Sequence, residues 1–286
     1  MLGQLGYPGA GWGWKYDNVD VPAATPGTSV AIGISDAEGS WVQVASSANI
    51  AQDVYLFTLN FSNYNLSGYN LNCCLDVGVD PAGGSSYTEV IQNIICGMAG
   101  APPRENAATF VFPLFIKAGS SVAVRGSSSY TVAANARVQM TFYGRPRRPD
   151  LVRAGQYAEG VGSITNNVGV SFTPGNGAEG SWASLGSTTR PCWWWQIGVG
   201  ISNSAVAAQY THVDLAVGDG SSYDIIIENY GIYHYGTAEI TSRFYPHRGL
   251  IEGNWEVPAG GTLYVRGRCS TSPGTTYNAR AIGIGG

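Results

Sequence analysis

The five-residue sequence AEGSW occurs twice in this chain, at residues 37–41 and again at residues 178–182. Further matching patches follow each copy in the same order. They lie at 75–77 and 213–215, 84–87 and 220–223, 93 and 229, 124–126 and 265–267, and 135–137 and 278–280. Coincidence does not preserve the order of so many patches, so the repeat indicates an internal duplication. Two long copies are too few for a solenoid and predict two domains.

The boundary between the copies falls in a stretch rich in proline and arginine, GRPRRPD, at residues 144–150. Proline stiffens such a connector, and the arginines keep it in water. We therefore expect a first domain over residues 1–143, a linker over 144–154 and a second domain over 155–286. The N-terminal stretch, which is rich in Gly, Pro and Trp, is expected either to form an arm toward another subunit or to form an ordinary first strand.

Short apolar runs with a two-residue alternation indicate β-strands throughout the chain. They occur at residues 53–61, 122–125, 138–142, 195–201 and 262–266. Turn formers such as PAGG and GDGS separate the runs, and no stretch has a sustained helical period. The chain has 40 glycines and only 12% charged residues, a composition that suits strands and tight turns. We predict an all-β protein of two tandem antiparallel β-sandwich domains, each resembling a jelly roll.

Composition also argues against several classes of partner. The net charge of −4 provides no basic field, so we expect no nucleic-acid binding. No apolar run approaches the length of a membrane helix, and the N-terminal sequence has no signal-peptide pattern, so we expect no membrane insertion and synthesis in the cytoplasm. The five cysteines fit no zinc spacing and are expected to be small, buried, reduced residues.

Histidine offers little for catalysis. The three histidines, at positions 212, 234 and 247, all lie in the second copy, so a site inherited by both copies cannot depend on histidine. The chain contains no nucleophile elbow, zinc-protease motif or P-loop. We therefore expect the histidines to be structural, the protein not to be an enzyme, and no cofactor.

Carboxylates leave one catalytic alternative open. Glu38 and Glu179 lie in the repeated pentapeptide, and Asp76 and Asp214 lie in the second repeated patch. A glycosidase needs two carboxylates about 5 to 10 Å apart, so a polysaccharide depolymerase remains an alternative. The simpler interpretation is that the pentapeptide closes a turn and its tryptophan anchors the fold. Aspartates near Gly-rich turns could offer oxygen ligands to calcium, but the EF-hand spacing is absent and we expect no metal.

Aromatic residues are the richest feature of the second copy. In the sequence CWWW, a strand would place Trp193 and Trp195 on one face and Trp194 on the other. At least one indole would then face away from the core unless another chain or domain covers it. Further aromatic residues crowd the segment that follows. We take Trp193, Trp195, Tyr233, His234, Tyr235 and Tyr245 as candidates for glycan binding or subunit contact, with core packing as the alternative.

Three patches carry a resemblance to a known group of proteins. They are LDVGV at 75–79, VIQN at 90–93 and FPLFIKAGSSVAVR at 112–125. They resemble a pattern of accessory virion proteins of tailed bacteriophages and phage-derived particles, of the head-decoration, spike or fibre type. There, a similar strand precedes an apolar strand and a Pro-Leu-x-Ile-x-Ala-Gly-Ser turn. The resemblance covers about a third of the first copy and departs from the pattern at 254–261 in the second. It implies a β-rich virion component and carries over no catalytic residues.

The resemblance and the composition together predict a structural protein on the surface of a phage-like particle. The two copies differ most between residues 97–106 and 231–238, where binding loops are expected on such a scaffold. One domain would dock on other virion proteins or drive homo-oligomerisation as a trimer or pentamer. The other would face outward and bind host-surface polysaccharide. The alternatives are a pure cement or tail protein without glycan binding, and the depolymerase.

Overall fold

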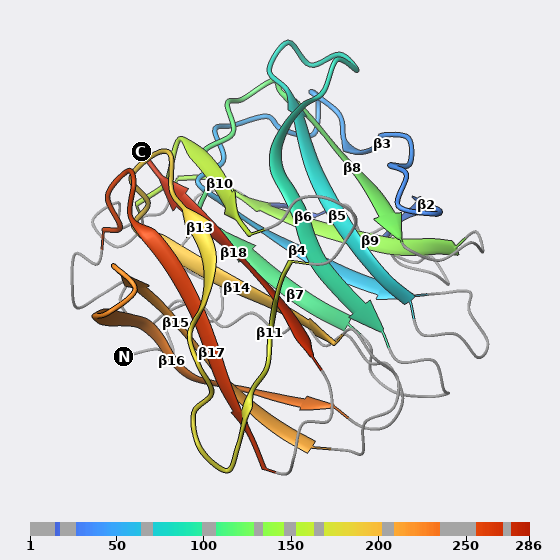
Figure 1. Cartoon of the computed structure of the whole chain (residues 1–286). Coiled ribbons are helices and arrows are strands. Elements are labelled where there is room, and N and C mark those ends of the chain that lie inside the picture. Colours follow the sequence, from blue (N-terminus) through green and yellow to red (C-terminus); the bar gives the residue numbers. More distant parts are fainter. Residues whose placement is uncertain are drawn as a thin grey trace.

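The computed structural model describes residues 15–17, 27–63, 71–98, 107–128, 134–145, 153–162, 169–201, 209–234, 256–270 and 276–286. All regular elements in these ranges are β-strands, and none is a helix (Figure 1). The described residues accordingly contain no helix that could cross a membrane. The all-β prediction is confirmed.

Nine strands form the first half of the chain. They are β1 (Lys15–Asp17), β2 (Thr28–Gly33), β3 (Val42–Ala45), β4 (Leu56–Asn63), β5 (Leu71–Asp80), β6 (Thr88–Met98), β7 (Ala107–Phe112), β8 (Ser121–Ser128) and β9 (Ala134–Tyr143). One row runs β1-β9-β4-β7 and the other runs β3-β8-β5-β6, and β2 joins them by pairing with both β9 and β8. Apart from the β5–β6 hairpin, which lies within one row, successive strands from β3 onward alternate between the rows, and this is the strand order of a jelly roll.

The second half repeats this order. Its strands are β10 (Tyr157–Val161), β11 (Val170–Phe172), β12 (Gly175–Asn176), β13 (Ala183–Ser187), β14 (Trp194–Ile201), β15 (Gln209–Gly218), β16 (Tyr223–His234), β17 (Thr262–Cys269) and β18 (Tyr277–Gly285). One sheet runs β10-β18-β14 and the other β13-β17-β15-β16. Residues 235–255, between β16 and β17, where a counterpart of β7 would fall, lie outside the described ranges.

One strand connects the two sheets in the first half but is divided in the second. The β2 strand pairs antiparallel with β9 and parallel with β8. In the second half, β11 makes the antiparallel pairing with β18 and β12 makes the parallel pairing with β17. Pro174 lies between β11 and β12, and a proline cannot donate a hydrogen bond to a ladder. The expectation of purely antiparallel sandwiches is therefore wrong at one pairing in each half, where the chain crosses between sheets.

The irregularities of the sheets also recur at matching positions. The β3–β8 pairing shifts register between Gln43 and Ala45, and the β13–β17 pairing shifts between Ser184 and Gly186. The β5–β6 and β15–β16 ladders each contain a shift at the repeated aspartate patch. Bulges re-aim side chains, so the two halves present equivalent residues in equivalent directions.

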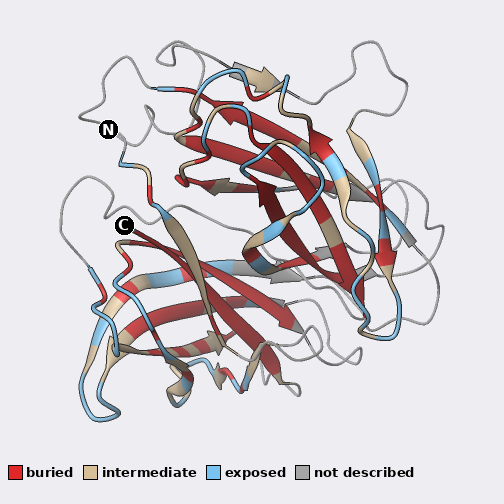
Figure 2. Cartoon of the chain, turned by 90° about the horizontal axis from the view of Figure 1, so that it is seen from above, coloured by how far each residue is buried: buried red, intermediate tan, exposed pale blue. Residues whose placement is uncertain are grey.

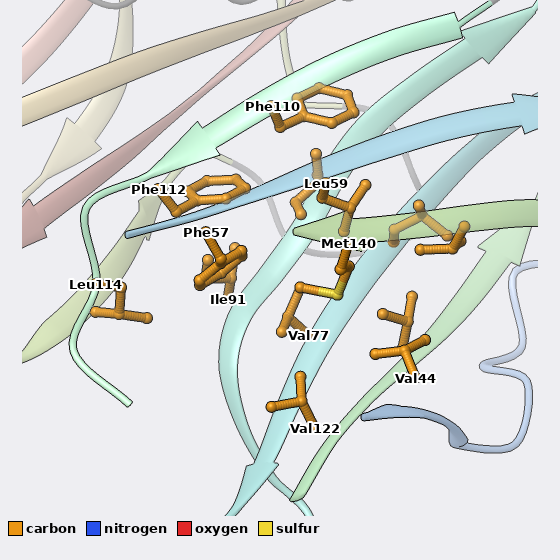
Figure 3. Close-up of a cluster of buried hydrophobic side chains, with 14 of the residues drawn as sticks. Val44, Phe57, Leu59, Val77, Ile91, Phe110, Phe112, Leu114, Val122 and Met140 are labelled. Carbon is orange, nitrogen blue, oxygen red and sulfur yellow. The ribbon is translucent and has the colours of Figure 1, made fainter. Parts of the chain in front are cut away.

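The core of the first half lies between its two rows of strands (Figure 3). Phe57 and Leu59 from β4, Phe112 from β7 and Met140 from β9 all have no exposed surface, and they meet Val77 from β5. Phe57 packs on Phe112 with ring centroids 5.2 Å apart. Burying large side chains of this kind stabilises a fold by about 1.5 to 3 kcal/mol each.

The two halves share part of this core. Trp194, Ile282 and Ile284 belong to the second half, yet they pack in the hydrophobic cluster of the first. Trp194 meets Phe112 edge to face, with centroids 6.3 Å apart. The β18 strand is consequently buried at every position on both of its faces (Figure 2). The halves are joined by an apolar seam and do not behave as beads on a linker.

The equivalent outward face of the first half has a different composition. Where β18 contributes Asn278, Arg280 and Ile282 to the seam, β9 has Asn135, Arg137 and Gln139, all of which keep contact with solvent. Two of the three positions carry the same residue types, so the faces differ in burial and in the isoleucine that stands at 282 where the first half has Gln139.

The predicted boundaries fall partly outside the described residues. Strand β1 pairs with β9, so residues 15–17 form a first strand of the first half, while residues 1–14 and 18–26 are not described. Most of the predicted linker, residues 146–152, is also not described. Immediately after it, Gly155 pairs with Leu114 in a parallel bridge, which attaches the start of the second half to the first.

A polar centre present in both halves as the candidate functional site

The repeated pentapeptide contributes to a polar centre on the outer face of the β3-β8-β5-β6 row. Arg125 on β8 lies in its middle, with its side chain 22% exposed. Its Nε donates to Asp76 Oδ2 at 2.9 Å and its Nη2 donates to Glu89 Oε2 at 2.6 Å. Glu38 Oε2 lies 3.5 Å from the same Nε. Trp41 covers the guanidinium, with its ring centroid 4.5 Å from Cζ.

Each residue of the pentapeptide with a defined contact has a physical reason to be there. Glu38 supplies a carboxylate to Arg125, and Trp41 supplies a π face. Gly39 donates its N–H to the Gly126 carbonyl at 2.9 Å where the chain passes over β8. A Cβ at Gly39 would lie 2.7 Å from the Ala31 carbonyl oxygen, so only glycine fits there. The turn that was expected to close at AEGSW is thus a crossing held against β8.

The buried carboxylate of Asp76 organises the centre. Its Oδ1 accepts the backbone N–H of Asn93 at 2.7 Å while Oδ2 accepts from Arg125. Asn93 lies in the bulge of β6 and has a positive φ of 51°. Asparagine tolerates this left-handed conformation better than most residues. The carboxylate of Asp76 is only 3% exposed. It is stabilised there because it accepts hydrogen bonds from a buried N–H and from a guanidinium.

The second half builds the same centre with matching distances. Arg266 Nε donates to Asp214 Oδ2 at 2.9 Å, and Asn229 N donates to Asp214 Oδ1 at 2.7 Å. Glu179 Oε2 lies 3.7 Å from Arg266 Nε, and the Trp182 ring centroid lies 4.4 Å from Arg266 Cζ. Four of the sequence patches that repeat therefore meet at one point of the fold in each half.

Two positions give the centres different charges. By strand register, the second half has Ile225 where the first half has Glu89, and it has Arg268 where the first half has Ser127. The first centre holds three carboxylates and one guanidinium, for a formal charge of −3 + 1 = −2. The second holds two carboxylates and two guanidinium groups, for a formal charge of −2 + 2 = 0.

The surplus of carboxylates perturbs the first centre. Burial, followed by the charge of Asp76, raises the pKa of Glu38 from its usual value of 4.5 to about 7. The same two causes, in the same order, raise the pKa of Glu89. The buried guanidinium of Arg280 lies across the seam and has no hydrogen-bond partner among the described residues. Burial lowers its pKa, while the charges of Cys74, Asp76 and Glu89 act in the opposite direction.

The carboxylates that could have formed a hydrolase pair are held by arginine. Asp76 and Asp214 each bind an arginine and a backbone N–H, and each glutamate of the pentapeptide faces the same arginine. The aspartates at the Gly-rich turns cap backbone groups: Asp219 accepts from Ser221 and Ser222, which lowers its pKa to about 2. No group of three or more metal-binding side chains occurs among the described residues.

Of the six predicted candidates for glycan binding or subunit contact, only Trp193 and Trp195 have side chains that the structure describes. Trp195 is 1% exposed in the core of the second half, where it has no face open to a ligand. Trp193 is partly buried against the seam and lies under Arg153, 5.0 Å from its Cζ. Tyr233 and His234 end β16 opposite Tyr210 and Gln209, and their side chains are not described. Tyr235 and Tyr245 lie outside the described residues.

Sequence reasoning treated Trp194 only as the indole that another domain would have to cover. The structure shows that the first half provides this cover. It also shows that all five cysteines are free and buried, as predicted. Burial raises the pKa of Cys192 to about 12, and burial also raises the pKa of Cys74 and the pKa of Cys96.

Comparison with known proteins gives likenesses of fold only. No protein-family model and no curated protein sequence matches the chain. The structure of broad bean stain virus is 12% identical, with 93% of this chain and 92% of that chain covered and a TM-score of 0.35. PNGase F, a glycosylasparaginase from Flavobacterium meningosepticum, is 9% identical, with 95% and 96% covered and a TM-score of 0.38.

A third structure, the T13 viral particle of infectious bursal disease virus, is 11% identical, with 95% of this chain and 68% of that chain covered and a TM-score of 0.27. These TM-scores are low. The description of the fold as a jelly roll therefore rests on strand order and register, and not on these likenesses.

Proposed function

We propose that the chain is a non-enzymatic structural protein on the surface of a phage-like particle, made of two jelly-roll domains that arose by duplication. The first domain docks on other virion proteins, and the second faces outward and binds polysaccharide of the host surface. The protein acts as a homo-oligomer, a trimer or a pentamer. The observation that carries the proposal is the apolar seam, which makes two jelly rolls into one unit with two unlike ends.

The seam supports a structural role because it fixes the orientation of one domain on the other. Three large apolar side chains of the second half are inserted into the core of the first, so a load applied to one half is passed to the other. A particle-surface protein that must present one domain while holding on with the other needs such a connection.

The patch that resembles virion proteins has a structural role in this seam. Leu114 and Ile116 are each 2% exposed, and Ile116 pairs with Val54. Phe115 N donates to the Gly155 carbonyl at 2.8 Å, which places the patch at the junction of the halves. Gly119 has a φ of 79°, which closes the turn before β8. A structural motif at a junction accords with a role in assembly.

The carboxylates support a non-enzymatic role. Glu38 and Asp76 both face Arg125, and Asp76 also accepts the backbone N–H of Asn93, so their contacts are accounted for within the fold. A depolymerase would lose turnover in Glu38→Gln or Glu179→Gln while remaining folded. Absence of turnover of host polysaccharide by the unaltered protein is the expected result.

Particle association can be tested directly. Particles purified from the source would be probed with antibodies against the recombinant chain, by immunogold electron microscopy and by blotting. Surface labelling, together with saturable co-sedimentation of the recombinant protein with host cells, is expected. Particles that lack the chain would overturn the proposal. Labelled particles combined with no binding of folded oligomer to cells or their polysaccharide would leave a cement role.

A further inference from the structure

One rung of side chains differs in chemistry between the two halves. In the second half, Gly231, His212 and Arg268 are cross-strand neighbours on β16, β15 and β17, and we call them the His212 rung. The equivalent residues of the first half are Ile95, Cys74 and Ser127 on β6, β5 and β8. The scaffold is the same, so the difference is a property of the side chains.

In the first half this rung is covered. Cys74 and Ile95 are each 3% exposed and form a small apolar cluster of their own. Strands β10, β14 and β18 of the second half pack against β6, which places the apolar rung beside the seam. A thiol, an isoleucine and a buried serine suit a contact between domains.

In the second half the rung is open. Gly231 is exposed, and a Cβ built on it would meet no atom within 4 Å. The Arg268 side chain is 42% exposed. Tyr210, two residues before His212 on the same face of β15, is 61% exposed. The outer face of this sheet is therefore open above Gly231 among the described residues, with the exposed ring of Tyr210 on the neighbouring strand.

Arg268, beside this open space, has N–H groups that its described contacts do not use. Arg268 Nη2 donates to Asn229 Oδ1 at 3.2 Å, and Arg268 Nε lies 3.6 Å from Glu179 Oε1. A guanidinium has five N–H groups, so donors remain for a ligand. His212 Nδ1 is a buried atom without a hydrogen-bond partner among the described residues, so this nitrogen of the imidazole is turned away from solvent. A planar guanidinium beside an imidazole matches the geometry of a carboxylate.

The same face continues into a second aromatic group. Trp182 stacks on Tyr223 with centroids 4.7 Å apart, and Tyr223 meets Tyr264 edge to face at 5.1 Å. The first half has Trp41 and Tyr87 but has Ala123 in place of Tyr264. Aromatic faces at both ends of a guanidinium-bearing strip suit an extended chain of sugar rings better than a single small ion.

We propose that the His212 rung binds a carboxylate-bearing sugar of an acidic polysaccharide, with Arg268 on the carboxylate, His212 beside it and Tyr210 against the ring. The inference rests on the proposed function, in which the second domain binds host polysaccharide, and it names the surface and the class of ligand. Charge complementarity decides the class, because the half-exposed guanidinium of Arg268 keeps donors that its contacts with Asn229 and Glu179 do not use.

The test uses the full chain with tetragalacturonate and sialyllactose as acidic probes. The methyl ester of tetragalacturonate and lactose are the neutral controls. Binding is followed by calorimetry and by the ring signals of isotope-labelled histidine. Saturable binding of at least one acidic probe is expected, with a shift of the His212 signals and no response to the neutral controls.

Three variants locate the site. Arg268→Ser introduces the residue of the first half and should weaken binding about tenfold, as expected for one charge-assisted hydrogen bond. Gly231→Ile places a side chain in the open space above Gly231 and removes no hydrogen-bond donor. It should therefore block binding. Arg190→Ser removes an exposed arginine that stacks on Tyr157 and should leave binding unchanged. Unchanged urea midpoints verify that the variants are folded.

The outcomes separate the inference from the function on which it rests. Binding that survives both Arg268→Ser and Gly231→Ile, or no binding of either acidic probe, would overturn the His212 rung as the site. If such a protein still labels particles and sediments with host cells, the proposed function stands without this site. If it does neither, both fail together.

Discussion

The two polar centres allow one substitution to be made twice in the same molecule. Asp76 and Asp214 have the same burial, the same backbone partner and the same 2.9 Å contact with arginine. Asparagine at either position keeps an oxygen for the backbone N–H but removes the charge. The difference between the two losses in free energy of unfolding then reports the charges that remain around each arginine.

The structure predicts unequal costs. Asp214→Asn leaves Arg266 and Arg268 with Glu179 alone, and breaking a buried ion pair this way costs about 3 kcal/mol when the arginine is partly exposed. Asp76→Asn leaves Arg125 with Glu38 and Glu89, and it removes a negative charge from a centre that has two in excess. We expect about 1 kcal/mol there, mainly from the weaker hydrogen bond to Asn93.

The assay is urea unfolding of both variants and the unaltered protein at about pH 8, followed by tryptophan fluorescence and circular dichroism. Equal m-values would show that the denatured states are comparable. Asp224→Asn, at an exposed position of the second half, is the control and should change stability by less than about 0.5 kcal/mol.

Equal costs for Asp76→Asn and Asp214→Asn, or a larger cost for Asp76→Asn, would refute the reasoning from charge balance. A second condition sharpens the test. At about pH 5.5 Glu38 is largely protonated, because its pKa is raised to about 7. Arg125 then depends more on Asp76, so the gap between the two variants should narrow.

Three further predictions follow from the same structure. The raised pKa of Glu38 means that the folded protein holds a proton that the unfolded chain releases between pH 4.5 and about 7. The free energy of unfolding should therefore fall as the pH rises through this window. Glu38→Gln should flatten the dependence of the urea midpoint on pH. Trp194→Ala should destabilise the protein by about 3 to 5 kcal/mol, because it empties the centre of the seam, and a loss below about 1 kcal/mol in urea unfolding would contradict a shared core. The five buried thiols should not react with a disulfide reagent until the chain unfolds, and rapid native labelling of any cysteine would contradict their burial.

Much of the architecture could be predicted from the sequence because the signals are local and repeated. Alternating runs indicated strands, and the order of the matching patches indicated two similar halves. Asp76, Asn93 and Arg125 were all noted as repeated positions, and the structure brings them together with Glu38. Residues that must meet in both halves are retained in both, so the repeat pattern was itself a list of the members of the polar centre.

The seam and the open rung could not be predicted in the same way. Trp194 and Trp195 are both buried, but one packs against the other half and one against its own core. Alternation along a strand separates two faces and does not say which of them another domain covers. The His212 rung escaped notice because only strand register, which the sequence does not provide, makes Gly231, His212 and Arg268 neighbours.

The unlike composition of the two seam faces limits how far this kind of contact can propagate. A head-to-tail contact that every module could repeat would link chain to chain without closure and produce fibres. Here the face on β14 and β18 is buried and inserts Trp194, Ile282 and Ile284 into the other half, while the matching face on β9 presents Arg137 and Gln139 to water. The face that receives this contact carries the buried pair Cys74 and Ile95 in the first half, whereas the second half has His212 and Gly231 at these positions. Stacking by this route therefore ends after a single step, inside one chain.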